Sequence, residues 1–227
     1  MLCWTPYFLY LPETPIEPKG FVSGFLAEIN TRVDVIMLGI FVSDEMVGVY
    51  SFASMFAEGF YMLTTVIRNN INPILSKMVI AKDFDGITKF IDKIRRWFCP
   101  TISLIILIFI SLYPLFLKMV FRTEKYDLYI QSWLVIIILL LGILVASGYI
   151  PFENILIQGG NPTYQSLLTV INVTSNIIFN AIFIPLIGIS GAAIGTTCAY
   201  LISTVYLCQM VQHCFGFSLF RLNFSSK

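Results

Sequence analysis

Charged residues are scarce in this chain of 227 residues. Only 12% of the sequence is Asp, Glu, Lys or Arg, about half the share in an ordinary soluble domain, while 57% is hydrophobic. The stretch 154–220 contains none of the four charged residue types. This shortage of charge excludes an ordinary soluble domain and predicts an integral membrane protein.

Residues that carry common enzyme chemistry are also scarce. The chain has one histidine, its five cysteines form no CxxC pair, and no P-loop, HExxH or GxSxG motif is present. The sequence therefore predicts a protein that is not an enzyme and has no metal site or cofactor, with cysteines acting as small apolar residues. A formal net charge of only +1 argues against a nucleic-acid partner, which would require a concentrated basic face.

Runs of about 20 apolar residues bounded by charge or by Pro and Gly predict transmembrane helices. Within the uncharged stretch, Pro and Gly clusters at 158–162 and 185–191 end one helix and allow the next to begin. We expect an all-α membrane domain over 20–215, following an irregular, proline-rich segment at 1–19 and preceding a tail at 216–227. Its six predicted spans cover about 21–42, 46–67, 97–117, 128–157, 163–184 and 189–212.

The distribution of Lys and Arg predicts the orientation of these spans, because positive loops stay in the cytoplasm. One side of the membrane would carry Lys19, Arg68, Lys77, Lys82, Lys89, Lys93, Arg95, Arg96, Arg221 and Lys227. The other side would carry only Lys118, Arg122 and Lys125. Both termini are therefore predicted to be cytoplasmic.

Apolar residues at helical spacing predict an amphipathic helix at about 82–96, either on the inner membrane face or simply solvated.

The first predicted span carries polar residues that lipid alone would disfavour. Glu28 and Arg32 lie one helical turn apart and form one stripe, while Asn30 and Asp34 form a second stripe on nearly the opposite side. Glu28 and Arg32 can form an ion pair within the helix. Asn30 and Asp34 need a partner from another helix or a hydrated cavity, because a charge in the bilayer centre costs roughly 2.5–3.5 kcal/mol or more.

The second span offers such partners. One side of it carries Glu58, Met62, Thr65, Asn69 and Asn72, with Arg68 close by. Consecutive helices joined by a short turn are antiparallel neighbours, so these polar stripes can line one interior.

Further along, Glu153 follows Pro151, which lacks the amide that a helix needs and favours a kink or hinge. Glu153 can equally be a residue near the cytoplasmic end that reaches water.

Three sequence strings resemble the second half of Wzx-type polysaccharide and O-antigen flippases, members of the multidrug/oligosaccharidyl-lipid/polysaccharide exporter superfamily. They are NTRVDVIMLGIFVSDEMVGVYSFASMF, INPILSKM and NPTYQSLLTVINVTSNIIFNAIFIPLIGISGAAIGTTCAYLI. Asp34 and Gly39 match an Asp before an apolar helix, and Pro73 matches a proline that ends the second helix. The glycine-rich turn from Pro185 to Ile194 matches the start of the last span. The resemblance covers about 20–215.

This resemblance implies two six-helix lobes that open alternately to the two sides of the bacterial cytoplasmic membrane. The substrate would be an undecaprenyl-diphosphate-linked oligosaccharide, with Arg32 and Arg68 meeting the diphosphate. Asp34, Glu58 and Glu28 would hold these arginines, bind sugar hydroxyls or take up coupling H⁺ or Na⁺. The six predicted helices correspond to the C-terminal lobe alone, so a separate N-terminal lobe or a second copy would complete the cavity.

Two other functions fit the same residues. In an ion-coupled exporter of small cations, Asp34 and Glu58 would bind Na⁺, H⁺ or the exported compound. In an inactive, truncated fragment, the polar residues would remain from an ancestral transporter. Both transport functions require that the acidic and basic side chains of the first two spans border a wet passage. An inactive fragment has no such requirement.

Overall fold

The structure is a computed structural model that describes residues 32–121 and 125–219, and all regular secondary structure in these ranges is helical. The predicted all-α architecture is confirmed. Four helices within the described ranges are long and apolar enough to cross a membrane: Phe84–Val120, Tyr126–Ala146, Pro162–Ile187 and Ile189–Phe215. These helices indicate a multi-pass membrane protein.

The first two predicted spans are not among these four. Only the end of the span expected at 21–42 is described, as helix α2 (Val33–Phe41), which lies before a two-residue turn. The second is helix α3 (Asp44–Ile80), which is 37 residues long but less apolar, because one of its faces is polar. The count of six spans therefore remains a prediction.

Helix α4 (Phe84–Val120) corrects the expected layout between the second and third spans. The predicted amphipathic helix at 82–96 does not lie apart from the span at 97–117, because both belong to this one helix. The apolar face of its first half packs on α3, where Ile87 and Ile91 are buried in the same cluster as Leu75. This packing explains the amphipathic pattern without a separate helix on the membrane surface.

Prolines do not end helices α3 and α4. Pro73 lies inside α3, although the sequence predicted that it would end that helix.

Pro114 lies inside α4 and lacks the amide that would bond to the carbonyl of Ile110. Trp133 on the neighbouring helix donates its indole N–H to that carbonyl at 3.2 Å. A neighbouring side chain thus satisfies the freed backbone group, as membrane helices with internal prolines require.

The predicted span at 128–157 is broken into short pieces. Helix α5 (Tyr126–Tyr129) leads into α6 (Ser132–Ala146), which is followed by a 3₁₀ turn, η1 (Ile150–Phe152), and by α7 (Ile155–Gln158). Pro151 stands inside the 3₁₀ turn, where its missing amide prevents a continuous α-helical ladder. We call residues 147–154 the broken segment.

The last two helices, α8 (Pro162–Ile187) and α9 (Ile189–Phe215), pack closely along their length. The turn between them is Gly188, whose φ of +60° is accessible mainly to glycine. Gly191 and Gly195 of α9 face α8: a methyl group would lie 2.2 Å from the carbonyl oxygen of Phe183 at Gly191 and 2.3 Å from Oδ1 of Asn180 at Gly195. Small residues four apart allow two membrane helices to approach this closely.

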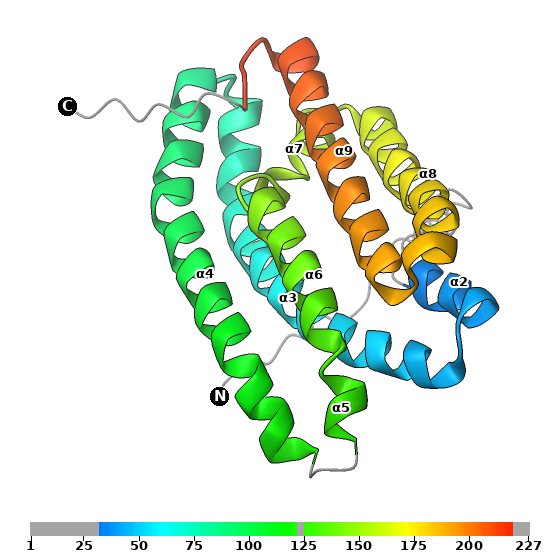
Figure 1. The fold of residues 1–227 in the computed structure, drawn as a ribbon. Coiled ribbons are helices and arrows are strands. Elements are labelled where there is room, and N and C mark those ends of the chain that lie inside the picture. Colours follow the sequence, from blue (N-terminus) through cyan, green and yellow to red (C-terminus); the bar gives the residue numbers. More distant parts are fainter. Residues whose placement is uncertain (1–31, 122–124, 220–227) are drawn as a thin grey trace, which may run out of the picture.

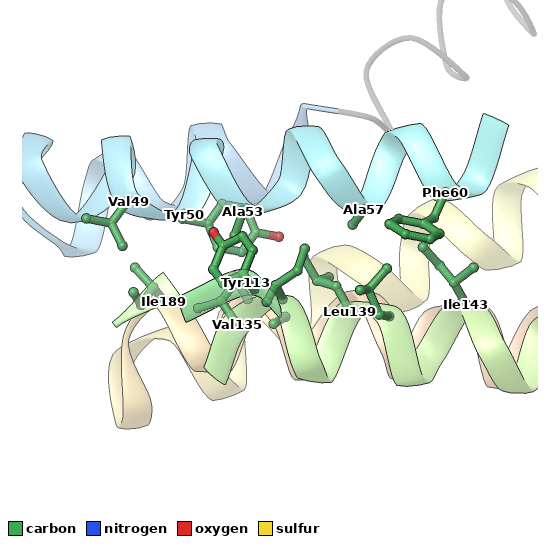
Figure 2. Packing of buried hydrophobic residues seen from close by; sticks show 14 of the residues in the cluster. Val49, Tyr50, Ala53, Ala57, Phe60, Tyr113, Val135, Leu139, Ile143 and Ile189 are labelled. Carbon is green, nitrogen blue, oxygen red and sulfur yellow. The ribbon is translucent and has the colours of Figure 1, made fainter. Parts of the chain in front are cut away.

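The helices form one bundle. In Figure 1, α4, α6, α9 and α8 run side by side, with α3 behind α6. Figure 2 shows how α3 and α6 meet: Val49, Ala53 and Phe60 face Val135, Leu139 and Ile143 across a close contact. A second buried cluster lies where α3 ends and α4 begins, and it includes residues of η1, α7, α8 and α9.

Candidate functional site: a polar cavity in the helical bundle

A cavity of about 380 Å³ lies among α2, α3, α6, the broken segment, α8 and α9. This volume is in the range of small-molecule binding sites. Most of its lining residues are polar, although the surrounding bundle is apolar: Asp34, Tyr50, Ser54, Glu58, Tyr61, Arg68, Tyr149, Glu153, Thr169, Asn172, Asn176, Thr196, Tyr200, Ser203 and Thr204. Buried polar groups cost free energy in an apolar interior, so their concentration here marks a candidate binding site.

Helix α3 supplies one wall of the cavity. Its lining residues repeat at helical spacing along one face, and they are Tyr50, Ser54, Ala57, Glu58, Tyr61 and Arg68. This face differs in part from the one predicted from the sequence, because Met62 and Asn69 are not among the lining residues. Glu58 and Arg68 were predicted from the sequence, whereas Tyr50 and Tyr61 were not.

Asp34 is buried and receives a hydrogen bond from another helix. The hydroxyl of Tyr50 on α3 donates to Oδ2 of Asp34 on α2, and the amide of Val35 donates to Oδ1 at 3.0 Å. A buried carboxylate needs such donors, because removal from water is costly. The sequence predicted that Asp34 would need either a partner from another helix or a hydrated cavity. The structure gives it Tyr50 as a partner and places it in the cavity lining, but the sequence did not identify Tyr50.

Arg68 and Glu153 form an ion pair across the cavity wall. Nη1 of Arg68 on α3 lies 2.7 Å from Oε2 of Glu153 on the broken segment, and the side chains are 18% and 29% exposed. Nearby, Gln158 of α7 donates to Asn72 of α3 at 2.9 Å. The first contact joins α3 to the broken segment, and the second joins α3 to α7, which follows it.

Helices α8 and α9 supply a wall of amides, hydroxyls and one aromatic ring. Asn172 donates to the hydroxyl of Ser203 at 2.8 Å, which ties α8 to α9 beside the cavity. The ring of Tyr200 on α9 stacks on Tyr61 of α3, with centroids 6.0 Å apart and an angle of 13° between the rings. Hydroxyl and amide groups together with flat aromatic faces suit a hydroxylated ligand such as a sugar.

Four of the predicted site residues come together in this cavity: Asp34, Glu58, Arg68 and Glu153. Arg32 and Asn69 are exposed and are not among its lining residues. Glu28 and Asn30 lie outside the described residues. The expected ion pair between Glu28 and Arg32 therefore remains a prediction.

Arg95 is the charged residue whose predicted location differs most from its location in the structure. It was counted among the cytoplasmic loop charges, but it is buried in α4 with only 7% of its surface exposed. Its Nε donates to the carbonyl of Gly148 at 2.6 Å, and its Nη1 donates to the carbonyl of Leu219 at 2.5 Å. The guanidinium carbon lies 4.5 Å from the centre of the Tyr149 ring. These contacts join Arg95 to residues far from it in the sequence, so the local hydrophobic pattern around Arg95 does not predict them.

The charges on the cavity wall are predominantly acidic. Three carboxylates, those of Asp34, Glu58 and Glu153, face one guanidinium, that of Arg68. No group of three or more His, Cys, Asp or Glu side chains in the described ranges is arranged to hold a metal ion. The arrangement can bind an anion at Arg68 and a cation or hydroxyl group near Asp34 and Glu58.

The chain is 29% identical over 171 residues to a protein of Haloferax volcanii described as "Probable flippase AglR". The aligned region is 72% of this chain and 34% of that relative, so the chain spans about a third of the relative's length. No family model matches the chain, and no solved structure matches it. The comparison supports a distant likeness to flippases.

Proposed function

We propose that this chain is one lobe of a transporter that moves a lipid-linked oligosaccharide across the cytoplasmic membrane by alternating access. The observation that carries the proposal is the polar cavity within a bundle of membrane-length apolar helices. Its hydroxyl and amide groups suit a glycan, and Arg68 suits a phosphate. The likeness to a probable flippase and to Wzx-type flippases points to the same class of cargo.

The cavity residues take different parts in this proposal. Arg68 meets the diphosphate, for which the resemblance suggests undecaprenyl diphosphate as the carrier. Asp34, held by Tyr50, and Glu58 bind sugar hydroxyls or the coupling ion, H⁺ or Na⁺. Arg32, which is exposed at the start of α2, extends the binding surface toward a second lobe. We propose a part in ligand binding for Glu28 and Asn30 as well, which lie outside the described residues.

A second lobe completes the passage in this proposal. The chain matches only about a third of its curated relative, and one lobe encloses only one wall of a two-lobe cavity. We propose that a separate N-terminal lobe or a second copy supplies the other wall, in a bacterial cytoplasmic membrane with both chain termini in the cytoplasm. The protein acts as a transporter and catalyses no covalent step.

The acidic excess in the cavity supports a second candidate function. The lining of the cavity includes three carboxylates, those of Asp34, Glu58 and Glu153, and one arginine, Arg68. Such a wall favours cations, as in an ion-coupled exporter of small cationic compounds. Resistance of expressing cells to cationic dyes that is lost in Asp34→Asn and Glu58→Gln, without any glycan movement, would favour this function.

Glycolipid translocation in vesicles tests the proposal. The full chain, alone and together with a candidate partner lobe, is reconstituted with a fluorescent lipid-linked oligosaccharide, and a membrane-impermeant quencher reports the outer-leaflet fraction. We expect movement that falls at least about tenfold in Arg68→Gln, because the anion loses its charge-assisted bonds. Glu45→Gln, an exposed residue outside the cavity, serves as the matched control. Glycolipid movement equal to that in empty vesicles, both for the chain alone and for the chain with the partner lobe, would contradict the proposal and support an inactive fragment.

A further inference from the structure

The broken segment is held from two sides by two arginines. Arg68 of α3 pairs with Glu153 near its end, and Arg95 of α4 binds the carbonyl of Gly148 near its start. The segment also lines the cavity through Tyr149, Ile150 and Glu153. The two arginines provide polar contacts that add to the apolar packing of Phe152 against α3.

The two arginines hold the segment in different ways. Arg95 is almost fully buried, and it binds the neutral carbonyls of Gly148 and Leu219, neither of which lines the cavity. Arg68 and Glu153 both line the cavity and are both partly exposed. An entering ligand can reach the second contact and cannot reach the first.

The ion pair with Glu153 uses only part of the hydrogen-bonding capacity of the Arg68 guanidinium. It joins one nitrogen, Nη1, to one carboxylate oxygen, and Nε of Arg68 is buried without a hydrogen-bond partner in the described part of the chain. A guanidinium binds phosphate through two parallel N–H bonds, and a diphosphate carries more charge than a carboxylate. A phosphate group therefore has two advantages over Glu153 as a partner for Arg68.

We infer that Glu153 occupies the anion-binding side of Arg68 in the empty protein, and that a phosphate group of the ligand displaces it and removes this polar contact between the broken segment and α3. Arg95 keeps the start of the segment on α4 and Phe152 keeps its apolar packing, so the change loosens the end of the segment around Glu153. The released Glu153 remains solvated because its side chain is already partly exposed. This inference rests on the proposed function, since it assumes a ligand that carries phosphate.

Binding of inorganic pyrophosphate to the purified full chain tests the displacement by calorimetry. Glu153→Gln keeps the shape of the side chain but removes the competing charge, so we expect it to bind pyrophosphate about tenfold more tightly than the unaltered protein. Arg68→Lys keeps the charge but loses the fork of donors, and we expect weaker binding than in the unaltered protein. Glu45→Gln should bind as the unaltered protein does. Equal affinity of Glu153→Gln and the unaltered protein would overturn the inference.

Hydrogen exchange tests this loosening. Pyrophosphate should speed exchange of the amides at 152–155 in the unaltered protein and leave it unchanged in Arg68→Gln. Unchanged exchange in the unaltered protein at saturating pyrophosphate would also overturn the inference. A short-chain prenyl diphosphate should compete with pyrophosphate, whereas competition by short-chain phosphatidylglycerol alone would assign the site to bulk lipid headgroups and overturn its link to the cargo.

The outcomes separate this inference from the proposed function. Glycolipid movement with no effect of Glu153→Gln on pyrophosphate affinity overturns the displacement alone. Tighter pyrophosphate binding in Glu153→Gln without glycolipid movement in vesicles overturns the flippase function and leaves the displacement supported.

Discussion

Tyr50 on α3 donates its hydroxyl to the buried carboxylate of Asp34 on α2, across the turn that joins the two helices. Tyr50→Phe removes this donor and leaves the carboxylate with fewer partners. We expect the free energy of unfolding to fall by about 1–3 kcal/mol, the cost of an unsatisfied buried polar group. Thermal unfolding of the purified protein in detergent measures the change.

Tyr129→Phe is the matched control for this prediction. The ring of Tyr129 stacks on Phe121, with ring centroids 4.0 Å apart, and its hydroxyl does not contact Asp34 in the described part of the chain. The same replacement should therefore change stability little. Equal losses in the two variants would show that the hydroxyl of Tyr50 contributes nothing specific.

The close packing of α8 and α9 depends on Gly191. In Gly191→Ala the added methyl group would stand 2.2 Å from the backbone oxygen of Phe183, which a side-chain rotation cannot relieve. We expect destabilisation of about 1–3 kcal/mol or more, as for an overpacked core. Gly48→Ala is the control, because nothing lies within 4 Å of a methyl group there and alanine favours a helix. Similar melting temperatures for the two variants would rule out this packing.

Trp133 and Pro114 should be energetically coupled. Trp133→Phe leaves the carbonyl of Ile110 without the indole donor, and we expect a loss of about 1 kcal/mol beyond the change in packing. Pro114→Ala restores a helical amide that can bond to the same carbonyl. A double-mutant cycle should therefore show that Trp133→Phe costs less in the Pro114→Ala background.

The exposed Trp97 provides the comparison for this cycle. Its side chain is 73% exposed and lies on the same helix as Pro114. Trp97→Phe should show no coupling to Pro114→Ala. Additive effects of Trp133→Phe and Pro114→Ala would mean that the indole bond to Ile110 carries no free energy.

Arg68 and Arg32 should differ in their importance for transport. Both were predicted to meet the phosphate, but Arg68 lines the cavity and Arg32 is exposed outside its lining. In the vesicle assay we expect Arg68→Gln to reduce glycolipid movement much more than Arg32→Gln. The opposite ranking would place the phosphate on the exposed side of α2 and exclude the cavity as its binding site.

The sequence predicted the helical class and the positions of several elements because long apolar runs leave little choice of structure. It predicted a helix at 163–184 and another at 189–212, and the structure has α8 at Pro162–Ile187 and α9 at Ile189–Phe215. It failed at Pro73, which was expected to end a helix and lies inside α3. At Pro151 it predicted a kink, and the structure has a 3₁₀ turn. Whether a proline ends, bends or continues a helix depends on neighbouring partners, which a local pattern does not contain.

The candidate site was predicted in part. Asp34, Glu58, Arg68 and Glu153 were selected because charges are rare in apolar helices, and the structure gathers them around one cavity. Tyr50 and the wall from α8 and α9 were missed, because tyrosine, serine, threonine and asparagine are common in membrane helices. Their significance depends on which helices are neighbours, and hydrophobic periodicity does not specify this.

Helices α3 and α4 are each 37 residues long, or about 55 Å, whereas the hydrocarbon core of a bilayer is about 30 Å thick. Part of each helix therefore lies beyond the thickness of the hydrocarbon. The hairpin that joins them packs against η1 and α7 through the second buried cluster. A movement of this hairpin would therefore be transmitted to the broken segment, and through it to the wall of the cavity.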